Sequence, residues 1–101
     1  MDKSVITLES VVSSVPNVLS SDIDGETMIM SIENGNYYGL DDIASVIWKM
    51  MASPVRIAEI VEELLPRFEV EREKCERDVL HLIAGLAQQS IVRVDGDAAH
   101  A

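Results

Sequence analysis

The residues from Asn34 to Trp48 read NGNYYGLDDIASVIW, and they contain the change from strand to helix that decides the fold. Asn34 and Gly35 form a tight-turn pair, because glycine tolerates the positive φ that such turns require. Residues 36–40 then supply a strand, and Asp41 is a natural N-cap whose carboxylate accepts from free backbone N–H groups. From Asp41 onward the spacing of the apolar residues changes from two to 3.6. This stretch therefore predicts a strand that leads directly into a helix.

Two further strands are predicted before this stretch. Residues 18–23 are followed by Asp24 and Gly25, a second pair with hairpin-turn chemistry. In the return strand, residues 26–32, methionine and isoleucine side chains recur at every second position. Two hairpin signals so close together predict a three-stranded antiparallel meander over residues 18–40.

Three helices are predicted after Asp41. The first ends before Pro54, whose ring disfavours helical geometry in the preceding residue. The second carries apolar residues at core spacing from Ile57 onward, and we expect Pro66 to end it. The third covers about residues 71–89 and contains no proline. Its apolar face is formed by Cys75, Val79, Leu82, Ile83 and Leu86.

The order of these elements predicts the fold class. Residues 91–94 suit a short final strand, and residues 5–16 suit a short strand or turn that packs on the domain. A three-stranded antiparallel sheet followed by three helices and a short C-terminal strand is an α+β fold of the winged helix-turn-helix type. Without internal repeats or a low-complexity linker, residues 1–101 are expected to form a single domain. We expect an ordered core over about residues 5–94 and a frayed tail over residues 95–101.

The chain is strongly acidic, with 8 Lys and Arg against 18 Asp and Glu and a formal net charge of -10. Residues 1–40 contribute half of that net charge. Such a charge repels nucleic-acid phosphates and anionic membrane surfaces, so neither is an expected partner. We see no apolar run long enough for a membrane span and no signal peptide, and the single cysteine, Cys75, suits a reducing compartment. A cytoplasmic protein is therefore expected.

Catalytic and metal-binding chemistry is not expected in this chain. Cys75 and His81 are six residues apart, which places them on different faces of a helix, and His100 lies in the expected tail. The cysteine and histidine spacings of zinc sites are missing, and the five glycines do not form a phosphate-binding loop. Cys75 is expected to be a small buried apolar residue. The sequence thus predicts neither an enzyme nor a cofactor.

A winged-helix transcription regulator is the alternative that the fold class suggests. Such proteins read DNA with a helix supported by basic residues. The predicted third helix instead mixes Glu71, Glu73, Glu76 and Asp78 with Arg72, Lys74 and Arg77. Because this helix has no net positive face, its charge disfavours DNA.

Residues 35–48 resemble the segment G-x-Y-x-x-L-N-x-x-A-x-x-I-W of PqqD-like proteins. These are recognition elements for ribosomally synthesised and post-translationally modified peptides (RiPPs), and they bind the leaders of precursor peptides. The resemblance continues through Pro54, residues 57–64 and residues 78–92, and it covers about residues 5–94. Two positions depart from the pattern: Asp41 replaces the usual Asn as a cap, and Arg56 stands where the family often has a capping Ser or Thr.

The resemblance is strongest to the stand-alone leader-binding proteins of lasso-peptide biosynthesis. It implies a non-catalytic role: the protein captures a leader and presents the precursor to a transglutaminase-like leader peptidase and a macrolactam-forming cyclase. The competing family role is that of the pyrroloquinoline-quinone peptide carrier, which delivers its peptide to a radical enzyme. In either case, the leader is expected to add as a fourth strand along residues 36–40, beside the third helix. The expected peptide-binding residues are Asn36, Tyr37, Tyr38, Gly39, Leu40, Cys75, Asp78, Val79 and Leu82.

The physics of sheet edges supports this mode of binding. An edge strand carries unpaired N–H and C=O groups that can pair with another chain, which also allows two copies to pair edge to edge. Adjacent strand residues face opposite sides, so one ring of Tyr37 and Tyr38 must lie outside the core. Trp48 is expected to anchor the first helix to the sheet. The acidic charge suggests that the peptide or the receiving enzyme presents basic residues.

Overall fold

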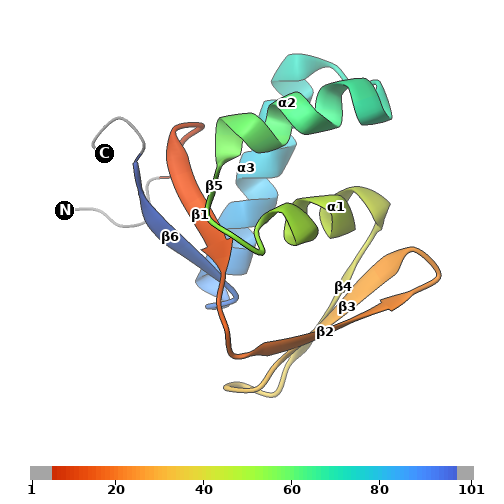
Figure 1. Ribbon diagram of the computed structural model, residues 1–101, viewed down its shortest axis with the longest axis vertical. Coiled ribbons are helices and arrows are strands. Elements are labelled where there is room, and N and C mark those ends of the chain that lie inside the picture. The colour runs from red at the N-terminus through yellow and green to blue at the C-terminus, as the bar shows by residue number, and fades with distance from the viewer. Residues whose placement is uncertain (1–5, 98–101) are drawn as a thin grey trace.

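A computed structural model describes residues 6–97, which form six strands and three helices. The elements are β1 (Ser10–Ser14), β2 (Val18–Ile23), β3 (Glu26–Ser31), β4 (Tyr37–Leu40), α1 (Asp42–Met50), β5 (Val55–Arg56), α2 (Ile57–Phe68), α3 (Arg72–Gln88) and β6 (Val92–Asp97). The strands form two antiparallel sheets, one in the order β2-β3-β4 and one in the order β5-β1-β6. The sheet β2-β3-β4 lies at one end of the molecule with α1 next to it (Figure 1).

The predicted meander and the three predicted helices are confirmed. The turn residues Asp24 and Gly25 have φ of 53° and 85°, and Gly35 has φ of 75°. Each value lies in the left-handed region that these turns require. Asp41 caps α1 as expected, because its carboxylate accepts a hydrogen bond from the amide of Ala44 at 2.8 Å. The α+β fold class predicted from the sequence is therefore correct.

The second sheet was not predicted from the sequence. β1 lies at its centre and pairs with β5 on one side and with β6 on the other. These three strands are far apart in the chain, and β5 has only two residues, so turn signals do not indicate their pairing. Because β6 continues to Asp97, the expectation of a frayed segment was wrong for residues 95–97. The remainder of the expected tail, residues 98–101, and Val5 lie outside the described residues.

The prediction that Pro66 ends the second helix was also wrong, since α2 continues to Phe68. Proline removes one N–H and crowds the carbonyl four residues earlier, but in the last turn this costs a single helical bond. Phe68 packs against the core, which favours the two further helical residues. At the other end of α2, arginine cannot accept a capping bond, and the Glu59 carboxylate instead accepts from the amide of Arg56 at 3.2 Å.

One hydrophobic core connects both sheets with all three helices. Its fully buried side chains come from every layer: Val12, Ile29, Ile47, Met51, Ile57, Ile60, Val61, Leu64, Ile83 and Ile91. Trp48 is buried at the α1–sheet boundary and borders a cavity together with Val18 and Thr27, which agrees with its expected anchoring role. This shared core holds β4, α1 and α3 in fixed relative positions.

Candidate functional site

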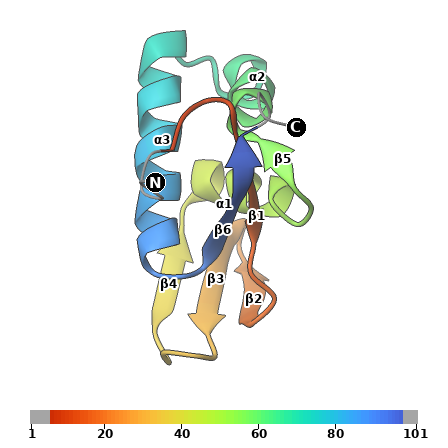
Figure 2. The ribbon, with the colours of Figure 1, turned by 90° about the vertical axis from the view of Figure 1, so that its left-hand side faces the viewer.

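β4 is an edge strand, and its outward backbone groups can be assigned from the ladder. The Ser31 amide donates to the Asn36 carbonyl at 2.9 Å, and the register continues with Ile29 opposite Tyr38. In an antiparallel ladder, hydrogen-bonded and non-bonded pairs alternate. Tyr38 is therefore bonded to β3, whereas the N–H and C=O groups of Tyr37 and Gly39 point to the free edge. Figure 2 shows this edge next to the C-terminal half of α3.

The side chains of β4 point to three different places. Tyr37 is 69% exposed and lies on the sheet face opposite α1. Tyr38 is half-buried, and its hydroxyl donates to Gln89 Oε1 at 3.1 Å, which connects β4 to the end of α3. Leu40 is buried in the core, while Asn36 and Gly39 are exposed. The expected residues Tyr37 and Gly39 thus offer the free edge their backbone groups rather than a side-chain pocket.

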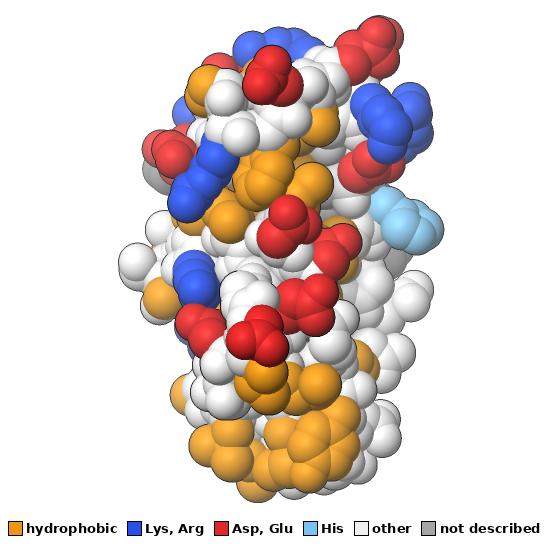
Figure 3. Space-filling view, turned by 90° about the vertical axis from the view of Figure 1, so that its right-hand side faces the viewer, with side chains coloured by type: hydrophobic (Ala, Val, Ile, Leu, Met, Phe, Trp, Pro, Cys, Tyr) orange, Lys and Arg blue, Asp and Glu red, His pale blue; other side chains and the backbone are white. Residues whose placement is uncertain are grey.

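The expected residues of the third helix do come together, at a pocket of about 250 Å³. Cys75, Asp78, Val79 and Leu82 line one wall from α3. Lys74 of α3 and Asp41 also border it, and residues from α1, α2 and the following loop complete the lining: Ile43, Ala44, Ile47, Leu64, Phe68 and Val70. The side of the molecule drawn in Figure 3 has a group of hydrophobic side chains in its upper part. The pocket begins directly after β4, so a chain that extends the sheet along β4 would reach it.

Sequence reasoning missed the walls that α1 and α2 contribute. Ile43 and Ile47 share the apolar face of α1, and the sequence alone indicates only that this face is buried. Phe68 packs against the core and also borders the pocket. Periodicity cannot separate a core position from a pocket wall, because both need an apolar side chain on the inner face of a helix.

Charged groups at the rim of the pocket are paired within the chain. Lys74 Nζ lies 2.7 Å from Asp78 Oδ2, and this hydrogen bond lowers the pKa of the Asp78 carboxyl. The neighbouring thiol of Cys75 is buried, and burial together with the charges of Asp78 and Glu76 raises its pKa. A thiol with a raised pKa stays protonated at neutral pH, so Cys75 is a poor nucleophile. Among residues 6–97, the structure has no group of three His, Cys, Asp or Glu side chains that could hold a metal ion.

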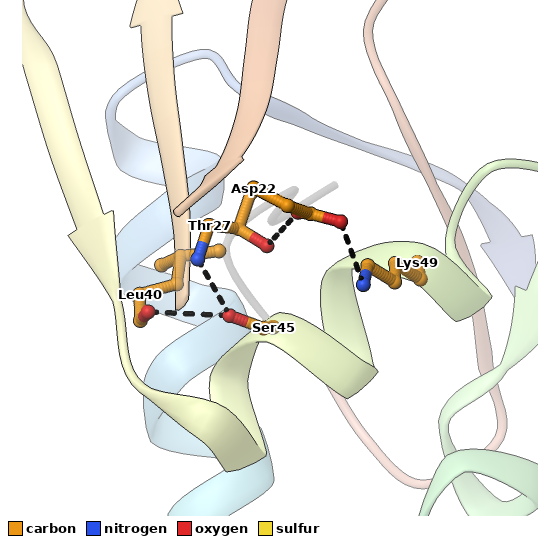
Figure 4. A network of polar contacts seen from close by, with 5 residues as sticks. All are labelled: Asp22, Thr27, Leu40, Ser45 and Lys49. Atoms are coloured by element: carbon orange, nitrogen blue, oxygen red, sulfur yellow. Dashed lines mark hydrogen bonds and ion pairs between the residues drawn. The ribbon is translucent and has the colours of Figure 1, made fainter. Parts of the chain in front are cut away.

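A network of polar contacts fixes the end of β4 against α1 (Figure 4). Ser45 Oγ accepts from the Thr27 amide at 2.9 Å and donates to the Leu40 carbonyl at 3.2 Å. Thr27 and Leu40 are opposite each other in the ladder, so one hydroxyl connects both sides of the last rung. Thr27 Oγ1 donates to Asp22 Oδ1 at 2.9 Å, and Asp22 Oδ2 lies 3.0 Å from Lys49 Nζ. The network connects all three strands of this sheet to α1, the helix that forms one wall of the pocket.

The opposite side of the same sheet is an exposed apolar surface, which we call the outer face. It consists of four large exposed hydrophobic side chains: Leu19 and Ile23 from β2, Met28 from β3 and Tyr37 from β4. Figure 3 shows hydrophobic side chains at the lower end of the molecule, where this sheet lies, below a band of acidic side chains. Soluble monomers seldom expose large contiguous apolar patches unless these have a partner.

Comparison with known proteins places this geometry in a family. Residues 26–92 match the family model described as coenzyme PQQ synthesis protein D (PqqD). A search of curated proteins finds no match. None of the helices within residues 6–97 has the length and apolar character needed to span a membrane.

Three solved structures are similar to this chain. TbiB1 in complex with the TbiA(beta) leader peptide is 29% identical, with a TM-score of 0.77 over 84% of this chain and 99% of that chain. A lasso peptide synthetase B1 complexed with the leader peptide is 23% identical, with a TM-score of 0.72 over 81% of this chain and 96% of that chain. The PqqD truncation of Methylobacterium extorquens PqqCD, described as a stand-alone RiPP recognition element, is 20% identical, with a TM-score of 0.75 over 92% of this chain and 99% of that chain.

Proposed function

This chain belongs to the PqqD family, and we propose that it is a non-catalytic recognition protein that binds the leader of a lasso-peptide precursor. The observation that carries this proposal is the free edge of β4, where the backbone groups of Tyr37 and Gly39 point outward next to the pocket. The similarity to TbiB1, which was solved with a leader peptide, supports it.

In this proposal the leader adds as a fourth strand to the sheet β2-β3-β4. Main-chain bonds to Tyr37 and Gly39 supply affinity with little demand on sequence, as in other cases of strand addition. The pocket after Leu40 supplies specificity, because it accepts a side chain of the bound peptide. The network around Ser45 holds this edge in place before the peptide arrives, which reduces the entropy lost on binding.

We further propose that the bound precursor is presented to a leader peptidase and to a macrolactam-forming cyclase. A presenting protein needs a second contact surface that stays free when the peptide is bound. The outer face meets this requirement, because it is apolar, exposed and directed away from α1.

The proposal is tested by titrating a fluorescently labelled lasso-peptide leader, the TbiA(beta) leader peptide, and following its anisotropy. Gly39→Pro removes the outward N–H without touching the bonds between β3 and β4, and we expect affinity to fall roughly tenfold. Gly39→Ala is the matched control, since a Cβ there meets only Met28 Cε at 3.9 Å. Equal affinities for wild type and Gly39→Pro, with the far-ultraviolet circular dichroism unchanged, would contradict strand addition at β4.

A second function within the family is delivery of a precursor to a radical enzyme of pyrroloquinoline-quinone synthesis. The description of the matching family model favours it, because that description names this pathway. Titration with both classes of precursor leader separates the two functions by which leader binds. A transcription regulator is disfavoured by the net charge of -10 and would be recognised by DNA retardation at physiological salt.

A further inference from the structure

The pocket lies beyond the end of β4 rather than alongside it. It begins at Asp41, the first residue after the strand, and the strand residues themselves do not line it. Successive side chains of an extended peptide point to opposite sides, so a peptide on β4 can direct a side chain into this pocket only after passing Leu40. The pocket would therefore contact one segment of the peptide, and this segment differs from the one that pairs with β4.

The chemistry of the pocket restricts which side chain that segment can carry. Its walls are mainly apolar, with Ile43, Ile47, Leu64, Phe68, Val79 and Leu82 among them. Its volume of about 250 Å³ suits a single large apolar side chain rather than a folded element. Burial of such a side chain stabilises the complex by removing apolar surface from water on both partners.

The rim of the pocket carries two carboxylates and one internal cation. Asp78 is engaged by Lys74 four residues earlier on α3, and the two side chains are 58% and 61% exposed. An exposed pair of this kind contributes little to stability, so another cation can replace Lys74 at small cost. Asp41 uses Oδ1 to cap α1, and within residues 6–97 it forms no ion pair, since Lys74 is paired with Asp78. The rim therefore favours a positive charge that arrives with the ligand.

Resting on the proposed function, we propose that the pocket selects a leader segment in which an apolar anchor is followed or preceded, within two residues, by Lys or Arg. The anchor fills the pocket, and the basic side chain displaces Lys74 from the Asp78 carboxylate. Lys74 thus acts as an internal stand-in for the ligand's cation. An acidic residue beside the anchor would meet Asp41 and Asp78 and be rejected by like-charge repulsion.

The test uses the fluorescently labelled TbiA(beta) leader peptide and a set of single substitutions in it. Each apolar residue is changed to Ala and each Lys or Arg to Gln, and every peptide is titrated against wild type, Asp78→Asn and Lys74→Met. We expect one apolar position whose loss weakens binding roughly tenfold or more, since such anchors dominate interfaces. Changing a Lys or Arg within two residues of that anchor to Gln should weaken binding to wild type about threefold. The same change should not alter binding to Asp78→Asn. Lys74→Met, which keeps the apolar stem, should tighten binding about threefold.

Two outcomes would overturn this inference while leaving the proposed function intact. One is a leader that binds well and loses the same affinity in wild type and Asp78→Asn at every basic position. The other is a leader that binds with no basic residue within two positions of its anchor. Failure of the unmodified leader to bind, or equal binding by Gly39→Pro, would instead contradict strand addition itself. Circular dichroism of Asp78→Asn and Lys74→Met verifies that each variant is folded, and both side chains are exposed enough to change without disturbing the core.

Discussion

At the scale of single residues, Ser45 shows how a polar side chain can organise a binding edge. Its hydroxyl is buried and satisfies the Thr27 amide and the Leu40 carbonyl at once. The sequence indicates only a small residue within α1, because the need for a hydroxyl arises from the tertiary approach of β3 and β4. A contact of this type cannot be predicted from the periodicity of a helix.

Replacing Ser45 by Ala leaves the buried Thr27 amide without its hydrogen-bond acceptor. We expect the free energy of unfolding to fall by about 1–3 kcal/mol, the usual cost of an unsatisfied buried group. Urea titration followed by circular dichroism measures this value. Ser53→Ala, at an exposed position, is the control and should leave the midpoint unchanged. An unchanged midpoint in Ser45→Ala would show that the hydroxyl carries no stability.

Cys75 offers a direct probe of the pocket, because its thiol lines it. Burial and the nearby acidic groups raise the pKa of this thiol, so the reactive thiolate is scarcer at any given pH. We expect iodoacetamide to alkylate the folded protein at pH 7.5 much more slowly than the urea-unfolded chain, and the leader to slow it further. Mass spectrometry over time measures both rates. Alkylation at the same rate with and without bound leader would place the peptide away from Cys75.

At the scale of secondary structure, the strands of the meander and the helix cap are local features, and the sequence predicts them well. The turn pairs at Gly25 and Gly35 and the cap at Asp41 act within a few residues. The second sheet could not be predicted, because β1 pairs with β5, which follows the whole meander and α1, and with β6, which follows all three helices. The sequence also does not indicate which of Tyr37 and Tyr38 faces outward, because this depends on the helix that covers one side of the sheet.

The outer face gives a prediction that separates leader binding from presentation. Tyr37→Ser combined with Leu19→Ser removes two exposed apolar side chains without touching the core. We expect leader affinity to stay within about twofold, since the backbone of β4 is unchanged, while leader removal by a transglutaminase-like leader peptidase slows roughly tenfold. A time course of leader removal, followed by mass spectrometry, measures this rate. His81→Ser, exposed on α3, is the control. Normal processing by the double variant would exclude the outer face as the enzyme contact.

At the scale of the whole molecule, the net charge of -10 is distributed unevenly along the chain, with half of it in residues 1–40. Hydrogen bonds to cationic partners lower the pKa of Asp22, Glu62 and Asp78. When the folded state lowers the pKa of a carboxyl, the unfolded state binds more protons as the pH falls. These pairs therefore stabilise the fold above the unfolded pKa, and their contribution is lost as the pH falls through the folded pKa.

The resulting prediction is acid sensitivity that depends on the contact between Asp22 and Lys49. We expect the midpoint of thermal unfolding to fall as the pH drops below about 4. At pH 7, Asp22→Asn should unfold at a lower temperature than wild type. Between pH 7 and pH 3 its midpoint should fall by less than that of wild type, because the variant has no carboxylate to protonate at this position. Thermal scans across this range measure both effects. A parallel decline of wild type and variant would show that this pair does not contribute.

The central claim is that the leader extends the sheet at β4, and amide hydrogen exchange tests it most directly. Comparing free and leader-bound protein by NMR, we predict that the amides of Tyr37 and Gly39 become strongly protected, because they change from solvent-facing to hydrogen-bonded. The Tyr38 amide, already directed toward β3, should change little. Protection confined to the opposite edge, Val18–Ile23, or no new protection at Tyr37 and Gly39 in the saturated complex, would contradict the claim.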